Sequence, residues 1–210
     1  IPRIRLASIE PWDLHEKFFS LFTNKRLMPH IHLPLQSGCN SVLKRMARRC
    51  KTDDFKCIVN SARNQIENFN ITTDIIVGFP GETDEEWEKS LKFIKEIGFS
   101  HIHIFAYSAR EGTKASTFPN QIENSTKKER SKRLHKLTKL MRKNILNNEI
   151  GKEYSVLWES KDKDNNWTGY TDNYIKVILK NDKENIGNKI SKIKIIAVST
   201  NLNHCIAELV

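Results

Sequence analysis

The chain has 210 residues, of which 29% are charged and 38% are hydrophobic, and its formal net charge is +10 at pH 7. This composition is typical of a soluble globular protein, and no apolar run approaches the roughly 18 residues that a membrane span needs. The four cysteines form no CxxC pair, so we expect no disulfide framework, no zinc site and no iron–sulfur array. We expect the protein to reside in a reducing cytoplasm. The chain opens on Ile1 with no signal region, and we expect a piece of a longer protein.

The first half of the chain alternates between β-branched runs and amphipathic segments. The predicted strands are 4–9, 31–35, 72–77 and 102–105, and the predicted helices are 12–22, 41–69 (interrupted near Thr52) and 84–97. Thr83 is the expected N-cap of the last helix, and Gly98 is its expected C-cap. Strands and helices alternating at this spacing predict βαβ units and a parallel sheet.

A long basic helix is predicted over residues 125–149, where nine Lys or Arg accompany two Glu. Such an excess suits either a solvated helix face or a polyanionic partner. After Gly151 come the short β-type runs "EYSVLWES", "YIKVILK", "KIIAVST" and "CIAELV", which predict a small barrel or sandwich. We therefore expect two domains, 1–150 and 151–210.

Polar or glycine-rich residues follow each predicted strand of the first domain. They are Glu10, Gln36 to Gly38, Gly78 to Gly81, and Tyr107 with Ser108. Each is an ordinary loop by itself, but ligands bind at the carboxyl ends of parallel strands, so together they predict a binding rim. The glycines of "GFPGE" permit close backbone approach, and no GxGxxG or phosphate-loop motif is present. Asp74, inside a strand, is either a ribose contact or a structural ion-pair partner.

The sequence "HIH" occurs twice, at His30/His32 and at His101/His103. Residues two apart on a strand share a face, so either pair has the spacing to chelate a metal. Both pairs begin their strands, away from the rim, and no acid nearby in the sequence completes a ligand set. We expect packing residues here and no metal site.

Aromatic residues interleave with lysines in the second domain: Trp158, Trp167, Tyr170 and Tyr174. They suit either base stacking on a small RNA-binding barrel or the core of that barrel.

The motifs "RIRLASIEP", "HLPLQSGCNSVLKRMARR", "TTDIIVGFPGETDEEW" and "FAYSAREGT", in this order, resemble the radical S-adenosylmethionine methylthiotransferases. "GYTDNYIKV" resembles part of their C-terminal TRAM domain, a small RNA-binding β-barrel. The motifs "RIRLASIEP" and "GYTDNYIKV" are most similar to those of the members that act on threonylcarbamoyl-adenosine beside the tRNA anticodon. The resemblance implies an α/β fold, with the last four strands of a partial parallel β/α barrel followed by an OB-like TRAM barrel.

The resemblance also implies roles for individual residues. Glu10 would bind the methionyl ammonium of S-adenosylmethionine, Arg48 its carboxylate, and Gln36 and Asp74 the ribose or its neighbours. The backbone near Gly78 and Phe79, and from Phe105 to Tyr107, would line the adenine. The tRNA anticodon arm would lie on the basic helix and the barrel, with contacts from Lys127, Lys128, Arg130, Arg133, Trp167, Tyr170 and Tyr174.

Two 4Fe–4S clusters belong to full-length members of this family, and their CxxxCxxC motif is absent here. We therefore expect no catalytic residue in this chain and no activity in isolation. The alternatives are a methylthiotransferase for isopentenyladenosine in tRNA or for a ribosomal-protein aspartate, and a non-catalytic RNA-binding module.

Overall fold

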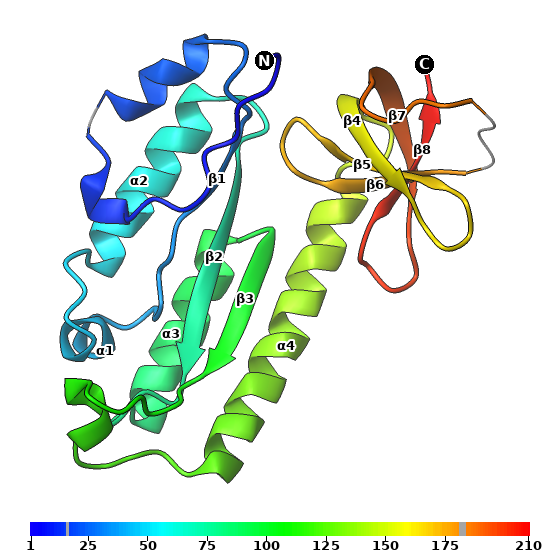
Figure 1. The fold of residues 1–210 in the computed structure, drawn as a ribbon. Helices are drawn as coiled ribbons and strands as arrows, with labels where there is room; N and C mark the ends of the chain where they lie inside the picture. The colour runs from blue at the N-terminus through cyan, green and yellow to red at the C-terminus, as the bar shows by residue number, and fades with distance from the viewer. Residues whose placement is uncertain (16, 181–183) are drawn as a thin grey trace.

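A computed structural model describes residues 1–15, 17–180 and 184–210 (Figure 1). It consists of an α/β part and a closed β-barrel, joined by the long helix α4 (Asn124–Asn147). This helix confirms the predicted basic helix. In the part of the chain that the structure describes, no helix has the length and apolar character to cross a membrane.

The α/β part is built on a parallel sheet in the order β1 (His30–His32), β2 (Asn70–Val77), β3 (His101–Ala106). These strands confirm three of the four predicted ones. Helices α1 (Asn40–Arg45) and α2 (Thr52–Gln65) lie between β1 and β2, and α3 (Asp84–Ile97) lies between β2 and β3. Helices α2 and α3 cover one face of the sheet, and α4 runs along β3 (Figure 1).

The predicted first strand is not a regular strand among the described residues. Residues 4–9 make isolated parallel bridges, Ile4 with Leu27 and Ser8 with His32. The two partners lie on either side of Pro29, which has no N–H to donate to a ladder. The segment therefore changes partner instead of adding a fourth strand.

The predicted helix over residues 12–22 is also wrong. The structure has two short 3-10 helices there, η1 (Pro11–Asp13) and η2 (Phe18–Thr23). A 3-10 turn places side chains three residues apart on the same side. Phe19 and Phe22 thereby both reach Phe69, with ring centroids 5.8 and 5.2 Å away.

Helix α3 begins and ends as predicted. The Thr83 hydroxyl accepts a hydrogen bond from the Glu86 N–H, and the Glu86 carboxylate accepts one from the Thr83 N–H. Gly98 ends the helix in the left-handed conformation, with φ 68°. The predicted interruption near Thr52 is the gap between α1 and α2.

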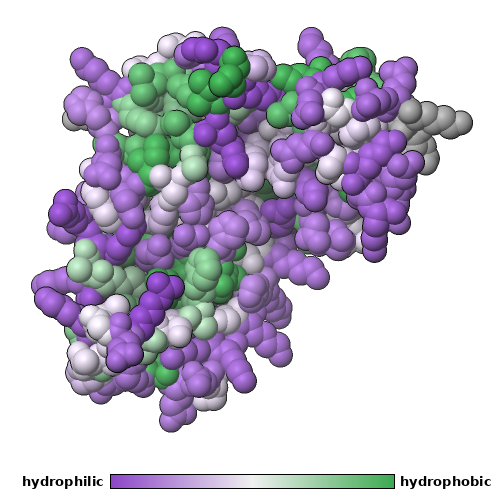
Figure 2. All heavy atoms as spheres, in the orientation of Figure 1, coloured by the Kyte–Doolittle hydropathy of each residue, from purple (hydrophilic) through white to green (hydrophobic). Residues whose placement is uncertain are grey.

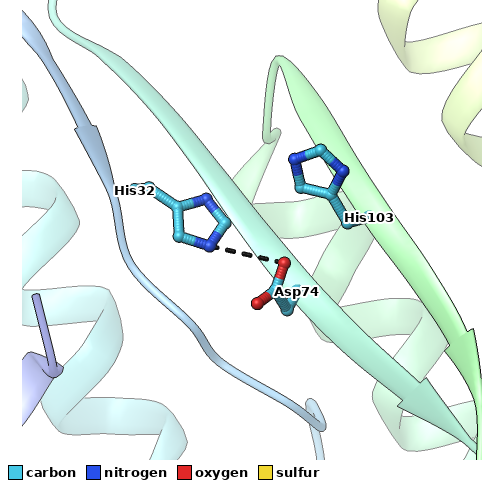
Figure 3. Close-up of side chains that lie close together, drawn as sticks. All are labelled: His32, Asp74 and His103. Atoms are coloured by element: carbon cyan, nitrogen blue, oxygen red, sulfur yellow. Dashed lines mark ion pairs between the residues drawn. The ribbon is translucent and has the colours of Figure 1, made fainter. Parts of the chain in front are cut away.

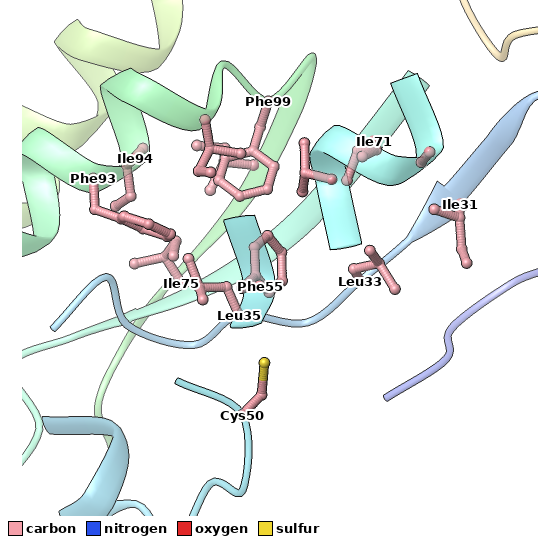
Figure 4. Close-up of a cluster of buried hydrophobic side chains, with 14 of the residues drawn as sticks. Ile31, Leu33, Leu35, Cys50, Phe55, Ile71, Ile75, Phe93, Ile94 and Phe99 are labelled. Carbon is pink, nitrogen blue, oxygen red and sulfur yellow. The ribbon is translucent and has the colours of Figure 1, made fainter. Parts of the chain in front are cut away.

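The core lies between the sheet and its helices (Figure 4). Ile71 and Ile75 of β2 pack there against Phe55 of α2 and Ile94 of α3, all at most 1% exposed. Side chains alternate along a strand. Thr72 and Asp74 therefore face the opposite side of the sheet, which we call the concave face and where the candidate site lies.

The barrel has the strand order β4-β5-β6-β8-β7 and is closed. Its strands are β4 (Glu153–Lys161), β5 (Trp167–Thr171), β6 (Lys176–Leu179), β7 (Ile190–Val198) and β8 (Cys205–Leu209). The Asn70 amide donates a hydrogen bond of 2.7 Å to the Asn173 carbonyl, and Arg142 donates one of 2.5 Å to the Leu202 carbonyl. These bonds hold the barrel near the amino ends of the sheet strands, away from the predicted rim.

Candidate functional site

Three of the predicted binding residues line one hollow at the carboxyl ends of the strands. Gln36, Asp74 and Tyr107 border this hollow of about 620 Å³, which we call the rim hollow. Gln36 has a φ of 73°, and its backbone pairs with both Asp74 and Ile76. The sheet therefore holds a non-glycine residue in a strained conformation where its amide can meet a ligand.

Tyr107 offers an unsatisfied hydroxyl at the rim hollow. Its Oη is buried and has no hydrogen-bond partner among the described atoms. Phe79 packs edge-on against the Tyr107 ring, with centroids 5.3 Å apart, and is itself 6% exposed. Phe79 thus supports Tyr107 from behind and does not line the hollow.

Gly78 is not open to a ligand, contrary to the expectation that its backbone lines an adenine. A Cβ added there would lie 2.5 Å from Cγ of Lys127, which packs across the glycine from α4. The Gly78 N–H donates to Glu82 at 2.9 Å. Its positive φ of 73° and this close approach account for the glycine.

Arg48 and Glu10, predicted to bind the two ends of a methionine, pair with each other. Arg48 also donates a hydrogen bond of 2.6 Å to the Pro34 carbonyl, and its guanidinium lies 4.3 Å from the Trp12 ring centroid. The structure therefore brings the predicted cation and anion together beside the sheet, with Arg48 mostly covered and Glu10 half-exposed.

The concave face carries a cluster that the sequence did not predict (Figure 3). His32 is the last residue of β1, Asp74 lies in β2 and His103 lies in β3. One ligand atom from each of the three lies within 4.8 Å of the others. His32 Nε2 is 3.3 Å from Asp74 Oδ1. The acid missing from the sequence neighbourhood of both histidine pairs comes from the strand between them. Alternation along each predicted strand was the signal that could have found it.

His30 lies beside this cluster and is 2% exposed. Burial lowers the pKa of His30 to about 3, and the charges of Arg5 and His32 act in the same direction. The imidazole is therefore neutral near pH 7. Its ring packs on Tyr174, with centroids 4.6 Å apart.

The two barrel tyrosines lie at the junction with the sheet. Tyr170 and Tyr174 stack with centroids 4.6 Å apart, and the Arg5 guanidinium lies 3.6 Å from the Tyr174 ring centroid. Both tyrosines line a hollow of about 260 Å³, which also includes His101 and His103 and which we call the junction hollow. The predicted stacking rings thus open onto the concave face of the sheet.

Two residues of the predicted RNA-binding set are buried, and we leave them out of it. Trp167 is 7% exposed in the barrel core and donates its indole N–H to the Glu184 carbonyl. Arg130 is 4% exposed and pairs with Glu82 at 2.9 Å and Asp84 at 2.7 Å. In both cases the face that turns inward is set by packing, which an interleaved sequence pattern does not reveal.

Three lysines of α4 border the strand ends, and Lys128 and Lys132 among them are exposed. Lys127, Lys128 and Lys132 line a hollow together with Ala106, Tyr107 and Ser108, which also border the rim hollow. In the view of Figure 2, hydrophilic side chains cover most of the visible surface over α4 and the barrel. A cationic surface therefore adjoins the rim hollow.

The cysteines do not form a cluster site. Cys39, Cys50 and Cys205 are buried, and Cys57 is exposed. Burial raises the pKa of Cys50 and of Cys205 to about 11, which keeps both as neutral thiols. Among the described residues, no group of three cysteines lies close enough to hold a metal.

Comparisons with known proteins agree with this architecture. Residues 3–94 match the family model of the radical SAM superfamily, and residues 148–203 match the TRAM domain. A solved structure has a similar fold. Coproporphyrinogen III oxidase (HemN) from Escherichia coli, described as a radical SAM enzyme, superposes with a TM-score of 0.56 at 14% identity, over 65% of this chain and 32% of that one. The α/β part therefore contains a radical SAM domain, and the barrel is a TRAM domain.

Among curated proteins, the chain is similar to tRNA methylthiotransferases. It is 36% identical over 93% of its length to threonylcarbamoyladenosine tRNA methylthiotransferase MtaB of Bacillus subtilis, and 38% identical over 94% to MtaB of Thermotoga maritima. It is also 37% identical over 93% to tRNA-2-methylthio-N(6)-dimethylallyladenosine synthase of Staphylococcus epidermidis. The chain spans 44% of the first two relatives and 38% of the third.

Proposed function

We propose that this chain is part of a tRNA-modifying methylthiotransferase whose complete form adds a methylthio group to C2 of N6-threonylcarbamoyladenosine next to the anticodon. The observation that carries the proposal is similarity over more than nine-tenths of the chain to proteins named for this reaction. The activity belongs to the whole protein, because the chain spans less than half of those relatives.

Residues at and beside the rim hollow are chemically suited to S-adenosylmethionine: Gln36 and Asp74 border the hollow, and Arg48 and Glu10 pair with each other beside the sheet. Arg48 and Glu10 complement the carboxylate and ammonium of a methionine, and Gln36 and Asp74 can hydrogen-bond ribose hydroxyls. The unpartnered Tyr107 Oη supports a polar ligand at the same place. When bound, S-adenosylmethionine supplies a methyl group and a source of the 5′-deoxyadenosyl radical, while these residues orient it and exclude water.

The residues of this chain do not fit the two 4Fe–4S clusters of full-length relatives. Its four cysteines are dispersed, and two of them are held as neutral thiols by burial. We infer that the cluster ligands lie outside this chain and that the isolated chain has no methylthiotransferase activity.

Side chains on the concave face argue for an RNA substrate. His103 borders the junction hollow beside Tyr170, and Asp74, its partner in the β2–β3 ladder, borders the rim hollow. The TRAM domain and the α4 cations would hold the anticodon arm. A base that leaves this arm would meet polar side chains between the junction hollow and the rim hollow. The proposal places the protein in the cytoplasm, with tRNA.

Mass spectrometry of tRNA nucleosides from a strain lacking the gene tests the proposal. We expect the methylthio form of threonylcarbamoyl-adenosine to disappear and to return when the full gene is restored. If that nucleoside persists and the methylthio dimethylallyl form is lost, the second candidate is correct, which the 37% identity to the Staphylococcus epidermidis protein supports. If all methylthio nucleosides persist, the tRNA assignment is wrong. A ribosomal-protein substrate or a non-catalytic RNA-binding role then remains.

A further inference from the structure

We propose that His32, Asp74 and His103 form a binding site for a divalent transition-metal ion such as Zn²⁺ or Fe²⁺. Two imidazoles and one carboxylate, with positions left open, are a ligand set that both ions use in proteins. The nitrogen ligands favour such ions over Mg²⁺ or Ca²⁺, which take oxygen ligands.

The backbone of the sheet fixes the three ligands. Asp74 is the ladder partner of His103, and His32 is the ladder partner of Thr72, the preceding residue on the same face of β2. Neighbouring strands lie about 4.8 Å apart, so side chains from three strands on one face converge without any loop. The cluster is therefore as rigid as the sheet that carries it.

The spacing of two ligand atoms already suits a metal. Atoms bonded to a tetrahedral zinc at about 2.1 Å lie about 3.4 Å from each other. His32 Nε2 and Asp74 Oδ1 are 3.3 Å apart. The ligand atom of His103 lies within 4.8 Å of the other two, and this side chain is exposed, so a change of its rotamer can close the remaining separation while the backbone stays in place.

A second-layer contact orients the first imidazole. Thr72 Oγ1 is 3.0 Å from His32 Nδ1, on the side of the ring away from Asp74. Thr72 is buried, and its hydroxyl also lies 3.2 Å from His30 Nε2. Metal-bound histidines usually have an oxygen partner at the second ring nitrogen, which selects the tautomer and the ring orientation.

The site opens onto both hollows of the concave face. His103 borders the junction hollow, and Asp74 borders the rim hollow. A bound ion would therefore keep coordination positions that a ligand in either hollow can reach. His32 Nε2 meets Oδ1 of Asp74, and a carboxylate has a second oxygen that can accept a hydrogen bond from a ribose hydroxyl.

Calorimetric titration of the 210-residue chain with Zn²⁺ alone tests the proposal, after the exposed thiol of Cys57 has been alkylated so that it does not compete. We expect a single site, weakened more than about 100-fold in His32→Ala and in His103→Ala. Thr72→Val, which keeps the shape but removes the hydroxyl, should weaken it by about 10- to 100-fold. His135→Ala removes an exposed histidine from α4 and should leave the affinity unchanged.

An ordinary histidine–aspartate hydrogen bond is the competing explanation. It predicts no Zn²⁺ binding by the folded chain, or binding that His32→Ala and His103→Ala leave unchanged, and either result overturns the proposal. Circular dichroism confirms that each variant is folded. S-adenosylmethionine binding by His103→Ala, which retains Asp74, is expected to equal that of the unaltered chain, so failure of the metal site is distinguishable from failure of the proposed function.

Discussion

The guanidinium of Arg48 meets the carboxylate of Glu10 through two hydrogen bonds, with Nη2 2.5 Å from Oε2 and Nη1 3.2 Å from Oε1. Such a two-point pair fixes the direction of both side chains. It also places the positive and negative groups that a methionine zwitterion needs within one contact of each other. In this structure the two groups satisfy each other, so binding of a methionine by either one would have to open the pair.

Replacing Arg48 with Ala should weaken S-adenosylmethionine binding by about tenfold or more, because a hydrogen bond to a charged group contributes about 1.5–3 kcal/mol. Isothermal titration of the chain measures the affinity. Arg49→Ala, at the exposed neighbouring position, is the matched control. Equal affinity in the two variants would remove Arg48 from the proposed site.

Gln36→Gly should separate backbone strain from binding. The φ of 73° costs a non-glycine residue about 1–2 kcal/mol, so glycine should raise the free energy of unfolding while it removes the amide from the rim hollow. We expect a more stable chain that binds S-adenosylmethionine more weakly, as measured by urea denaturation and titration. A stabilised variant with unchanged affinity would show that the Gln36 amide makes no contact with the ligand.

Gly78→Ala should destabilise the fold more than Gly112→Ala. Both glycines have positive φ values, 73° and 80°, so the conformational cost is similar. Only at Gly78 would the new methyl group meet a neighbour, Lys127, whereas nothing lies within 4 Å at Gly112. We expect the loss at Gly78 to exceed that at Gly112 by about 1–3 kcal/mol, the usual cost of overpacking. Equal losses would mean that Lys127 moves aside freely.

Arg130→Ala should lower the free energy of unfolding, because Glu82 is 2% exposed and would lose its buried cationic partner. Removal of one partner from a buried pair costs about 3–5 kcal/mol. Urea denaturation should show this loss. The exposed Lys128→Ala variant should stay within about 0.5 kcal/mol of the unaltered chain.

Lys128→Ala should instead weaken tRNA binding. It should also make the negative slope of log affinity against log salt concentration shallower by about one. Fluorescence anisotropy with labelled tRNA at several salt concentrations measures both quantities. An Arg130→Ala chain of unchanged stability and reduced tRNA affinity would contradict the structural role of Arg130.

Local signals in the sequence predicted what depends on local contacts. Helix α3 runs over the predicted residues because Thr83, Glu86 and Gly98 act within one turn of its ends. The predicted first strand failed because its pairing depends on a distant segment that turns at Pro29. The prediction that Trp167 and Arg130 lie on the RNA-binding surface was wrong. A short strand and a basic helix each have two faces, and packing decides which face is buried.

Three sheet strands, helices α3 and α4, the caps of α3 and the polar strand ends could be predicted from the sequence itself, because periodicity and turn chemistry act over a few residues. Only the tertiary structure decided which distant side chains meet. It joined Arg48 to Glu10 outside the sheet, and the parallel pairing of β1, β2 and β3 set Asp74 between His32 and His103. The chemistry proposed for this chain lies in those long-range contacts.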